Sequence, residues 1–326
     1  MIESLFQNGV LEAVDVNLYC NNETSRFANQ QQVNELYADK WKAFDDTDES
    51  NKKRAFDLQK KWYLELYGFK SVQELAACLQ GKKVILDAGC GLGYKSAWFA
   101  QLSPTSLVIG MDFSKCVSIA AKNYRQQENL FFVQADIADT HLLDDSVDYI
   151  NCDQVLHHTE NPAATLRELI RISKSNAQLA LYVYAQKAVP RELLDDYFRI
   201  QSSKMTYDEL YRMSDQITQL GKVLSELKTQ INVPDIPALR IKGGTYDLQR
   251  FLYWNFFKCF WNEELGYESS VLTNLDWYSP SNARRYSEDE FRHMIQQNHL
   301  QTLFFHQEEA CYSGRFLKPI PAYPES

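Results

Sequence analysis

The chain has 326 residues and a mass of 37.9 kDa, which leaves room for one large domain or two of ordinary size. Hydrophobic residues make up 45% and charged residues 24%, the mix of a globular protein, so a disordered or collagen-like chain is excluded. The 34 basic and 43 acidic residues give a net charge of −9. Broad binding to a nucleic-acid backbone is therefore not expected, although a local basic patch stays open.

The sequence predicts neither a membrane helix nor a secretion signal. The longest apolar run, Phe251–Trp261, is interrupted by Asn255 and Lys258 and falls far short of the ~20 residues that a membrane helix needs. Residues Met1–Val10 lack the basic start of a signal peptide. The seven cysteines are odd in number and form no C-x-x-C pair, which argues against disulfides or a zinc ribbon. We expect a cytoplasmic protein without a bound metal.

Residues 1–80 are expected to form a mostly helical N-terminal extension, because apolar and aromatic side chains recur there at helical spacing. The charged stretch Asp45–Arg54 predicts a solvated loop within it. From Lys82 the pattern changes to short apolar strands separated by amphipathic helices. Strands are predicted over 84–86, 107–111, 130–134, 147–152 and 178–184, and helices over 94–102, 114–127 and 163–173. Such strands are buried on both faces, which is typical of a parallel sheet in a doubly wound α/β domain.

Residues 189–280 are expected to form a long, mostly helical insertion, and the apolar run 251–261 predicts a buried helix within it. The sheet pattern returns afterwards. Ser287 and Glu290 form a capping box for a helix through Asn298, and strands over 302–306 and 311–317 predict a hairpin. The core is thus expected to comprise residues 81–188 and 281–326.

The central motif follows the first core strand, where Asp87 is followed by Gly89, Gly91 and Gly93, with Cys90 inside the loop. Glycines let a backbone turn sharply and approach a ligand at the carboxyl end of a strand. A nicotinamide dinucleotide needs G-x-G-x-x-G beside its pyrophosphate, and here the third glycine comes one residue early. A carboxylate at Asp87 suits a cationic ammonium or sulfonium ligand better.

Acids also end the next three strands. Asp112 stands about 20 residues beyond the loop, the position of an acid that binds both ribose hydroxyls, and Phe113 beside it can pack on adenine. Asp136 can accept from the adenine amine while Ile137 covers the ring, and Asp153 with Gln154 ends the fourth strand. The alternative for each acid by itself is a helix cap, and four acids at successive strand ends make that reading harder to sustain.

With these motifs the chain resembles the class I S-adenosylmethionine-dependent methyltransferases, and more narrowly the quinone-biosynthesis branch, methyltransferase type 11. The resemblance implies S-adenosylmethionine as cofactor, with S-adenosylhomocysteine as product. It implies a Rossmann-like sheet of seven strands in the order 3-2-1-4-5-7-6, with the last strand antiparallel. It also implies that the loop Asp87–Gly93, Asp112, Asp136 with Ile137, and the segment from Asp153 bind the cofactor.

Candidate catalytic residues lie near the expected methyl position. His157 and His158 suit proton removal near neutral pH, although either can instead pack or cap the helix that follows. Tyr184 and Tyr182 alternate on the fifth strand and can face a substrate, or can be core tyrosines.

Two further candidates for the substrate lie in the insertion. Tyr278 and Arg191 are candidate contacts, and a salt-bridged arginine is the alternative for the latter.

The leading hypothesis is a methyltransferase that modifies O, N or C of a small molecule, with the N-terminal helices and the insertion as lid. A tRNA or protein methyltransferase is one alternative, and a silent cofactor-binding partner subunit is another. No nucleic-acid or membrane partner is expected, and the insertion offers a surface for a homodimer.

Overall fold

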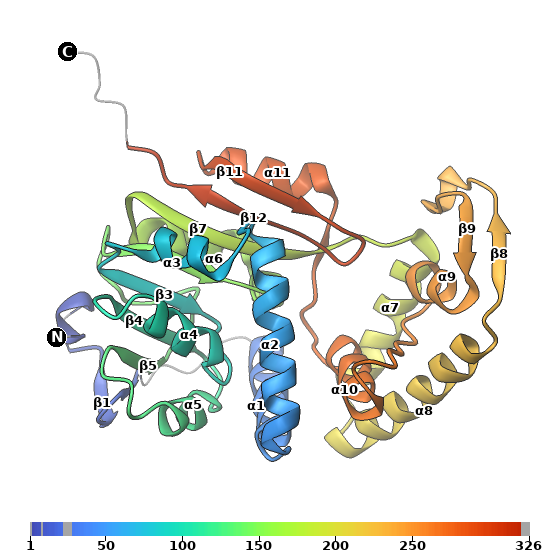
Figure 1. Cartoon of the computed structure of the whole chain (residues 1–326), viewed down its shortest axis with the longest axis horizontal. Helices are drawn as coiled ribbons and strands as arrows, with labels where there is room; N and C mark the ends of the chain where they lie inside the picture. Colours follow the sequence, from blue (N-terminus) through green and yellow to red (C-terminus); the bar gives the residue numbers. More distant parts are fainter. Residues whose placement is uncertain (1, 8, 22–27, 321–326) are drawn as a thin grey trace, which may run out of the picture. The chain divides into compact units, whose positions relative to one another are not determined.

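The computed structural model describes residues 2–7, 9–21 and 28–320. Two compact units make up the chain (Figure 1). The first unit comprises Met1–Ala185 and Arg284–Ser326, and the second unit comprises Gln186–Ala283. Among the described helices, none combines the length and the apolar content needed to cross a bilayer.

The first unit is built on a mostly parallel sheet. Its seven central strands are β3 (Val84–Ala88), β4 (Leu107–Asp112), β5 (Leu130–Gln134), β6 (Val147–Cys152), β7 (Ser173–Ala185), β11 (Gln301–Gln307) and β12 (Cys311–Leu317). They lie in the order β5-β4-β3-β6-β7-β12-β11, and β12 runs antiparallel to both of its neighbours. Counted along the chain this is 3-2-1-4-5-7-6, so the predicted fold is confirmed.

The sheet has further strands that the sequence analysis missed. A hairpin of β1 (Glu12–Asp15) and β2 (Leu18–Cys20) extends the β5 edge, with β2 parallel to β5, and β10 (Arg285–Tyr286) pairs with β7. The prediction of a helical start was therefore wrong for these residues. An edge strand leaves unpaired N–H and C=O groups that a neighbouring segment can cover, and the sequence pattern of a strand this short does not reveal it.

Helices follow the hairpin. Residues 22–27 of the predicted extension lie outside the described residues, and α1 (Ala28–Asp45) and α2 (Glu49–Leu66) come next. The solvated loop expected over Asp45–Arg54 shrinks to the residues between these helices, because Glu49 and its polar neighbours form the exposed first turns of α2.

Two apolar clusters cover the two faces of the sheet. One gathers side chains from α2, α3 (Val72–Leu79), α4 (Tyr94–Leu102) and α5 (Val117–Asn123). The other gathers side chains from α6 (Pro162–Ile172) and α11 (Glu288–Gln297), whose capping box forms as predicted. Burial on both faces explains why the strands read as continuous apolar runs.

The second unit contains α7 (Val189–Ser202), α8 (Tyr207–Glu226), α9 (Leu248–Asn255) and α10 (Tyr267–Tyr278). A hairpin of β8 (Gln230–Val233) and β9 (Gly244–Asp247) accompanies them. The helix predicted through residue 261 is wrong, since α9 ends at Asn255. A side chain of α10 binds the backbone that follows α9: Phe260 N donates to Asn274 Oδ1 at 2.9 Å.

Candidate cofactor and active site

The glycine loop joins β3 to α4 and depends on left-handed backbone angles. Gly89 has φ +82° and Gly93 has φ +74°, a region that side chains rarely adopt. A Cβ at Gly89 would lie 2.3 Å from Val155 Cγ2, and one at Gly93 would lie 2.6 Å from Phe132. The loop therefore packs so closely that only glycine fits, and the buried Cys90 forms part of the same turn.

Asp112, at the end of β4, is joined directly to this loop. Its Oδ2 accepts from Gly91 N at 2.8 Å, and its Oδ1 accepts from Ser114 N at 2.8 Å and Ser114 Oγ at 2.6 Å. Burial raises the pKa of Asp112 even though these donors favour its ionised form. A carboxylate offers about four acceptor positions, so roughly one remains for a hydroxyl of a bound nucleoside.

Asp136 and Ile137 lie just beyond β5. One carboxylate oxygen of Asp136 accepts from Ala138 N at 2.8 Å, and the side chain is half-buried, which raises its pKa. Ile137 is buried. Phe113, beyond β4, is half-buried, and its carbonyl accepts from Gln134 Nε2 at 3.3 Å. The second oxygen of Asp136 is thus open to a donor such as an exocyclic amine.

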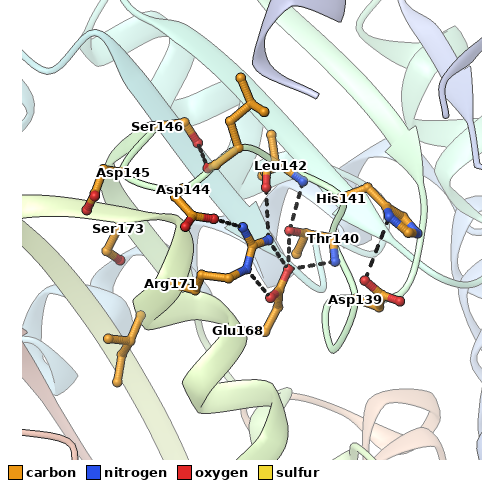
Figure 2. A network of polar contacts seen from close by, with 12 residues as sticks. Asp139, Thr140, His141, Leu142, Asp144, Asp145, Ser146, Glu168, Arg171 and Ser173 are labelled. Carbon is orange, nitrogen blue, oxygen red and sulfur yellow. Dashed lines mark hydrogen bonds and ion pairs between the residues drawn. The ribbon is translucent and has the colours of Figure 1, made fainter. Parts of the chain in front are cut away.

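A polar network fixes the loop that follows Asp136 (Figure 2). Glu168 on α6 accepts from Thr140 N at 2.9 Å and from Arg171 Nε at 2.7 Å. Arg171 also donates to Leu142 O at 2.8 Å and pairs with Asp144. Burial opposes the ionisation of Glu168, but the donors outweigh it and hold its pKa below the ordinary value.

Asp87 lies beneath the loop and is turned inward. It is 2% exposed, and it accepts from Ser96 Oγ at 2.5 Å and Asn151 Nδ2 at 2.7 Å. Burial raises its pKa despite these donors. Its hydrogen bonds tie the start of α4 and the end of β6 to β3. Asp87 therefore stabilises the positions of the elements that carry the glycine loop.

Asp153, beyond β6, forms a buried ion pair with Lys95 of α4. It also accepts from Tyr67 OH at 2.7 Å and Gln154 Nε2 at 3.2 Å. Burial by itself would lower the pKa of Lys95, but the charge and hydrogen bond of Asp153, together with Tyr94 and Asp87, outweigh burial and raise it. The sequence analysis gave neither Lys95 of α4 nor Tyr67, which directly follows α2, a role in the site, because the sequence pattern does not show that they meet Asp153.

The two histidines follow Asp153 in a single helical turn, and both are buried. The His157 ring lies 3.8 Å from the Tyr184 ring and 5.6 Å from the Tyr182 ring, between centroids. His158 Nε2 lies 3.0 Å from the hydroxyl of Tyr37 on α1. The structure therefore brings together four predicted residues and adds Tyr37, to which the sequence analysis gave no role in the site.

The remaining predicted substrate residues, Tyr278 and Arg191, belong to the second unit. Tyr278 OH donates to Lys258 O at 3.0 Å. Arg191 is 1% exposed and forms an ion pair with Asp195, 2.7 Å from Nε to Oδ2. The salt-bridged alternative thus describes Arg191 in this structure.

Among the described residues, His306, Glu308 and Cys311 place potential metal ligands within 4.8 Å of one another. The sequence analysis overlooked their spacing on the β11–β12 turn. Their contacts are accounted for by hydrogen bonds, since Cys311 Sγ donates to Glu308 Oε1 at 3.5 Å and His306 Nε2 lies 3.4 Å from Glu308 Oε2. Burial raises the pKa of the Cys311 thiol, which favours its protonated form.

Comparison with known proteins agrees with this geometry. Residues 86–181 match the model of a methyltransferase domain. The chain carries a class I S-adenosylmethionine-dependent methyltransferase domain. The matched residues include the glycine loop, all four strand-end acids and the histidine pair, so the cofactor of this methyltransferase domain is S-adenosylmethionine.

Individual relatives are more distant. The chain is 33% identical over 110 residues to an uncharacterised protein of Synechococcus, covering 32% of this chain and 26% of that one. It is 25% identical over 219 residues to a ubiquinone biosynthesis O-methyltransferase of Hahella chejuensis, covering 62% and 87%. A magnesium protoporphyrin IX methyltransferase from Synechocystis with bound S-adenosylhomocysteine aligns at 16% identity and TM-score 0.46, over 89% and 99%. The chain spans about a quarter of the Synechococcus relative.

Proposed function

We propose that the protein transfers the methyl group of S-adenosylmethionine to a small-molecule acceptor. The observation that carries this proposal is the link between loop and strand end: Gly91 N donates to Asp112 at 2.8 Å, and Asp112 keeps about one acceptor position. Asp136 keeps an oxygen at the next strand end. We expect these groups to accept hydrogen bonds from the ribose and the adenine of the cofactor.

The cofactor supplies a methyl group on a sulfonium, which leaves as a neutral thioether. Holding the acceptor in line with that methyl group and excluding water contributes several kcal/mol to lowering the barrier. Buried aromatic residues support such exclusion, because Tyr182, His157 and Tyr184 pack together beside the strand end.

His158 is the proposed base for an acceptor that must lose a proton. Its Nε2 contacts Tyr37 OH at 3.0 Å, so the hydroxyl orients the imidazole ring. The similarity to the ubiquinone biosynthesis O-methyltransferase of Hahella chejuensis supports a hydroxyl as acceptor, and a hydroxyl needs such a base.

Binding of S-adenosylhomocysteine to the full chain, measured by calorimetry, tests the cofactor site. Asp112→Ala should weaken binding by about a hundredfold, since a hydrogen bond to a charged group contributes about 1.5–3 kcal/mol and the loop loses its anchor. Asp139→Ala is the matched control, because its carboxylate is exposed on the loop after Asp136. Equal binding by both variants would contradict the proposal.

Turnover is measured separately, by labelled-methyl transfer from the cofactor into a metabolite extract. A labelled small molecule is the expected product. Label in tRNA or protein would instead support the alternative methyltransferases, and cofactor binding without any labelled product would support a silent partner subunit.

A further inference from the structure

Three cationic side chains surround one buried indole in the second unit. The Nζ atoms of Lys258 and Lys187 lie 4.6 Å and 5.9 Å from the centre of the Trp277 ring, and the Arg191 guanidinium carbon lies 5.1 Å from it. All four residues are at least nine-tenths buried. Cation–π contacts of this kind are each worth about 0.5–2 kcal/mol, less than the several kcal/mol that burying one unpaired charge costs.

Negative charge is scarcer here than positive charge. Arg191 is already matched, because it pairs with Asp195 and donates to Tyr253 O. Asp276 is half-buried and contributes at a distance. The Lys258 ammonium donates no hydrogen bond and forms no ion pair within the part of the chain that the structure describes, although only 7% of the residue is exposed.

An unmatched ammonium in this position is costly. Burial, together with the nearby charge of Arg191, lowers the pKa of Lys258 to about 7. The Lys258 ammonium therefore loses its proton far more readily than an exposed lysine does. An anion beside the ammonium would remove the penalty, since an opposite charge within about 4–6 Å favours the charged form.

The backbone around Lys258 is fixed by two side-chain hydrogen bonds and by close packing against α8. Tyr278 OH donates to Lys258 O at 3.0 Å, and Gln249 Nε2 donates to Cys259 O at 2.7 Å. The backbone at Cys259 packs directly against α8 at Gly221, where the Cβ of any other residue would lie 2.5 Å from Cys259 O. A group fixed in advance loses little entropy when a ligand binds.

We propose that the second unit holds a binding site for a small-molecule carboxylate, in which the carboxylate accepts from the Lys258 ammonium beside Trp277. A single unmatched ammonium favours a monoanion such as a carboxylate over the dianion of phosphate. This site goes beyond the proposed methyl transfer and is independent of it, so the failure of either leaves the other standing.

Calorimetric titration of the full chain with sodium benzoate tests the site, with benzamide as the neutral probe of the same shape and inorganic phosphate as the competing anion. Benzoate should bind saturably and benzamide should not. Lys258→Met should weaken benzoate binding by about tenfold or more, as expected for loss of one charge-assisted contact. Lys222→Met is the control, because Lys222 also lies over an indole, Trp261 at 5.8 Å, but is exposed and paired with Glu226.

The pH dependence of the unaltered protein gives a second reading that needs no variant. The charged groups around Lys258 are Lys187, Arg191, Asp195 and Asp276, and burial raises the pKa of Tyr253 and Tyr278, which keeps both neutral. Benzoate affinity should fall by about tenfold per pH unit above about pH 7, with proton uptake on binding.

Equal binding of benzoate and benzamide, or benzoate affinity that is constant across this pH range, would overturn the proposal. So would full benzoate binding by a folded Lys258→Met variant. Phosphate binding that depends on Lys258 without any benzoate binding would also overturn it, because the site would then belong to phosphate.

Discussion

The buried pair of Lys95 and Asp153 allows a quantitative prediction about the loop after β6. Lys95 is 8% exposed and Asp153 is 5% exposed, and Tyr67 OH donates to the same carboxylate at 2.7 Å. Asp153→Asn removes the charge but keeps the shape, so the ammonium of Lys95 is left buried without its counter-charge. Breaking one partner of a buried pair costs about 3–5 kcal/mol.

The matched change Lys95→Met leaves the carboxylate buried, with Tyr67 and Gln154 as its remaining side-chain donors among the described residues. It should destabilise the protein by a similar amount. The double variant leaves no unpaired charge, so its loss should fall short of the sum of the single losses by about 2 kcal/mol or more, within the range measured for coupled neighbours.

Urea unfolding, together with the melting temperature, measures these effects. A loss of about 3–5 kcal/mol corresponds to a drop of about 6–20 °C for a domain of this size. If each single variant unfolds within about 0.5 kcal/mol of the parent, as surface changes do, or if the double variant loses the full sum, the pair does not stabilise the loop and the reasoning is refuted. Calorimetry with S-adenosylhomocysteine on the folded variants shows separately whether Asp153 contacts the cofactor.

Three further outcomes follow from contacts around the site. Gly89→Ala should destabilise the protein by about 1–3 kcal/mol, since it adds a Cβ 2.3 Å from Val155 at a positive φ; unchanged urea unfolding would contradict this. Glu168→Gln should cost about 1.5–3 kcal/mol at neutral pH. Because the pKa of Glu168 is lowered from 4.5 in the folded protein, this contribution should be present above the unfolded pKa and vanish as pH falls through the folded one, which paired unfolding curves of parent and variant check. Tyr37→Phe should lower kcat by about tenfold and shift its pH profile through His158, with S-adenosylhomocysteine affinity unchanged; a change in affinity alone would mean that the hydroxyl only packs.

The sequence was sufficient to predict the parts of the fold that depend on periodicity. The strands β3 to β7 are buried on both faces, so each appears in the sequence as an apolar run that predicts a strand. The order of the sheet came from the resemblance, not from periodicity. The hairpin of β1 and β2 escaped notice because each strand is only a few residues long and β1 is exposed throughout. The position of the hairpin is set by its pairing with the free edge of β5, a long-range contact that the local sequence pattern does not contain.

The second unit was harder to predict because its irregular segment looks helical in sequence. The run from Phe251 to Trp261 is apolar enough for a buried helix, but α9 stops at Asn255. Contacts outside the run hold the backbone that follows: Asn274 of α10 binds the backbone of residue 260, and Gln249 of α9 itself binds that of residue 259. The lid role of the N-terminal helices and the dimer surface of the insertion stay predictions.

Four acids at successive strand ends look equivalent in the sequence, yet the structure divides them. Asp87 and Asp153 are almost fully buried and face donors from the fold, whereas Asp112 and Asp136 are half-buried. The difference lies in their partners, since Ser96, Asn151, Lys95 and Tyr67 all come from other elements. An inward carboxylate stabilises the loop geometry, and a carboxylate with acceptor capacity left binds the ligand. Substitution of the inward pair should therefore act first on unfolding, and substitution of the outer pair first on cofactor affinity.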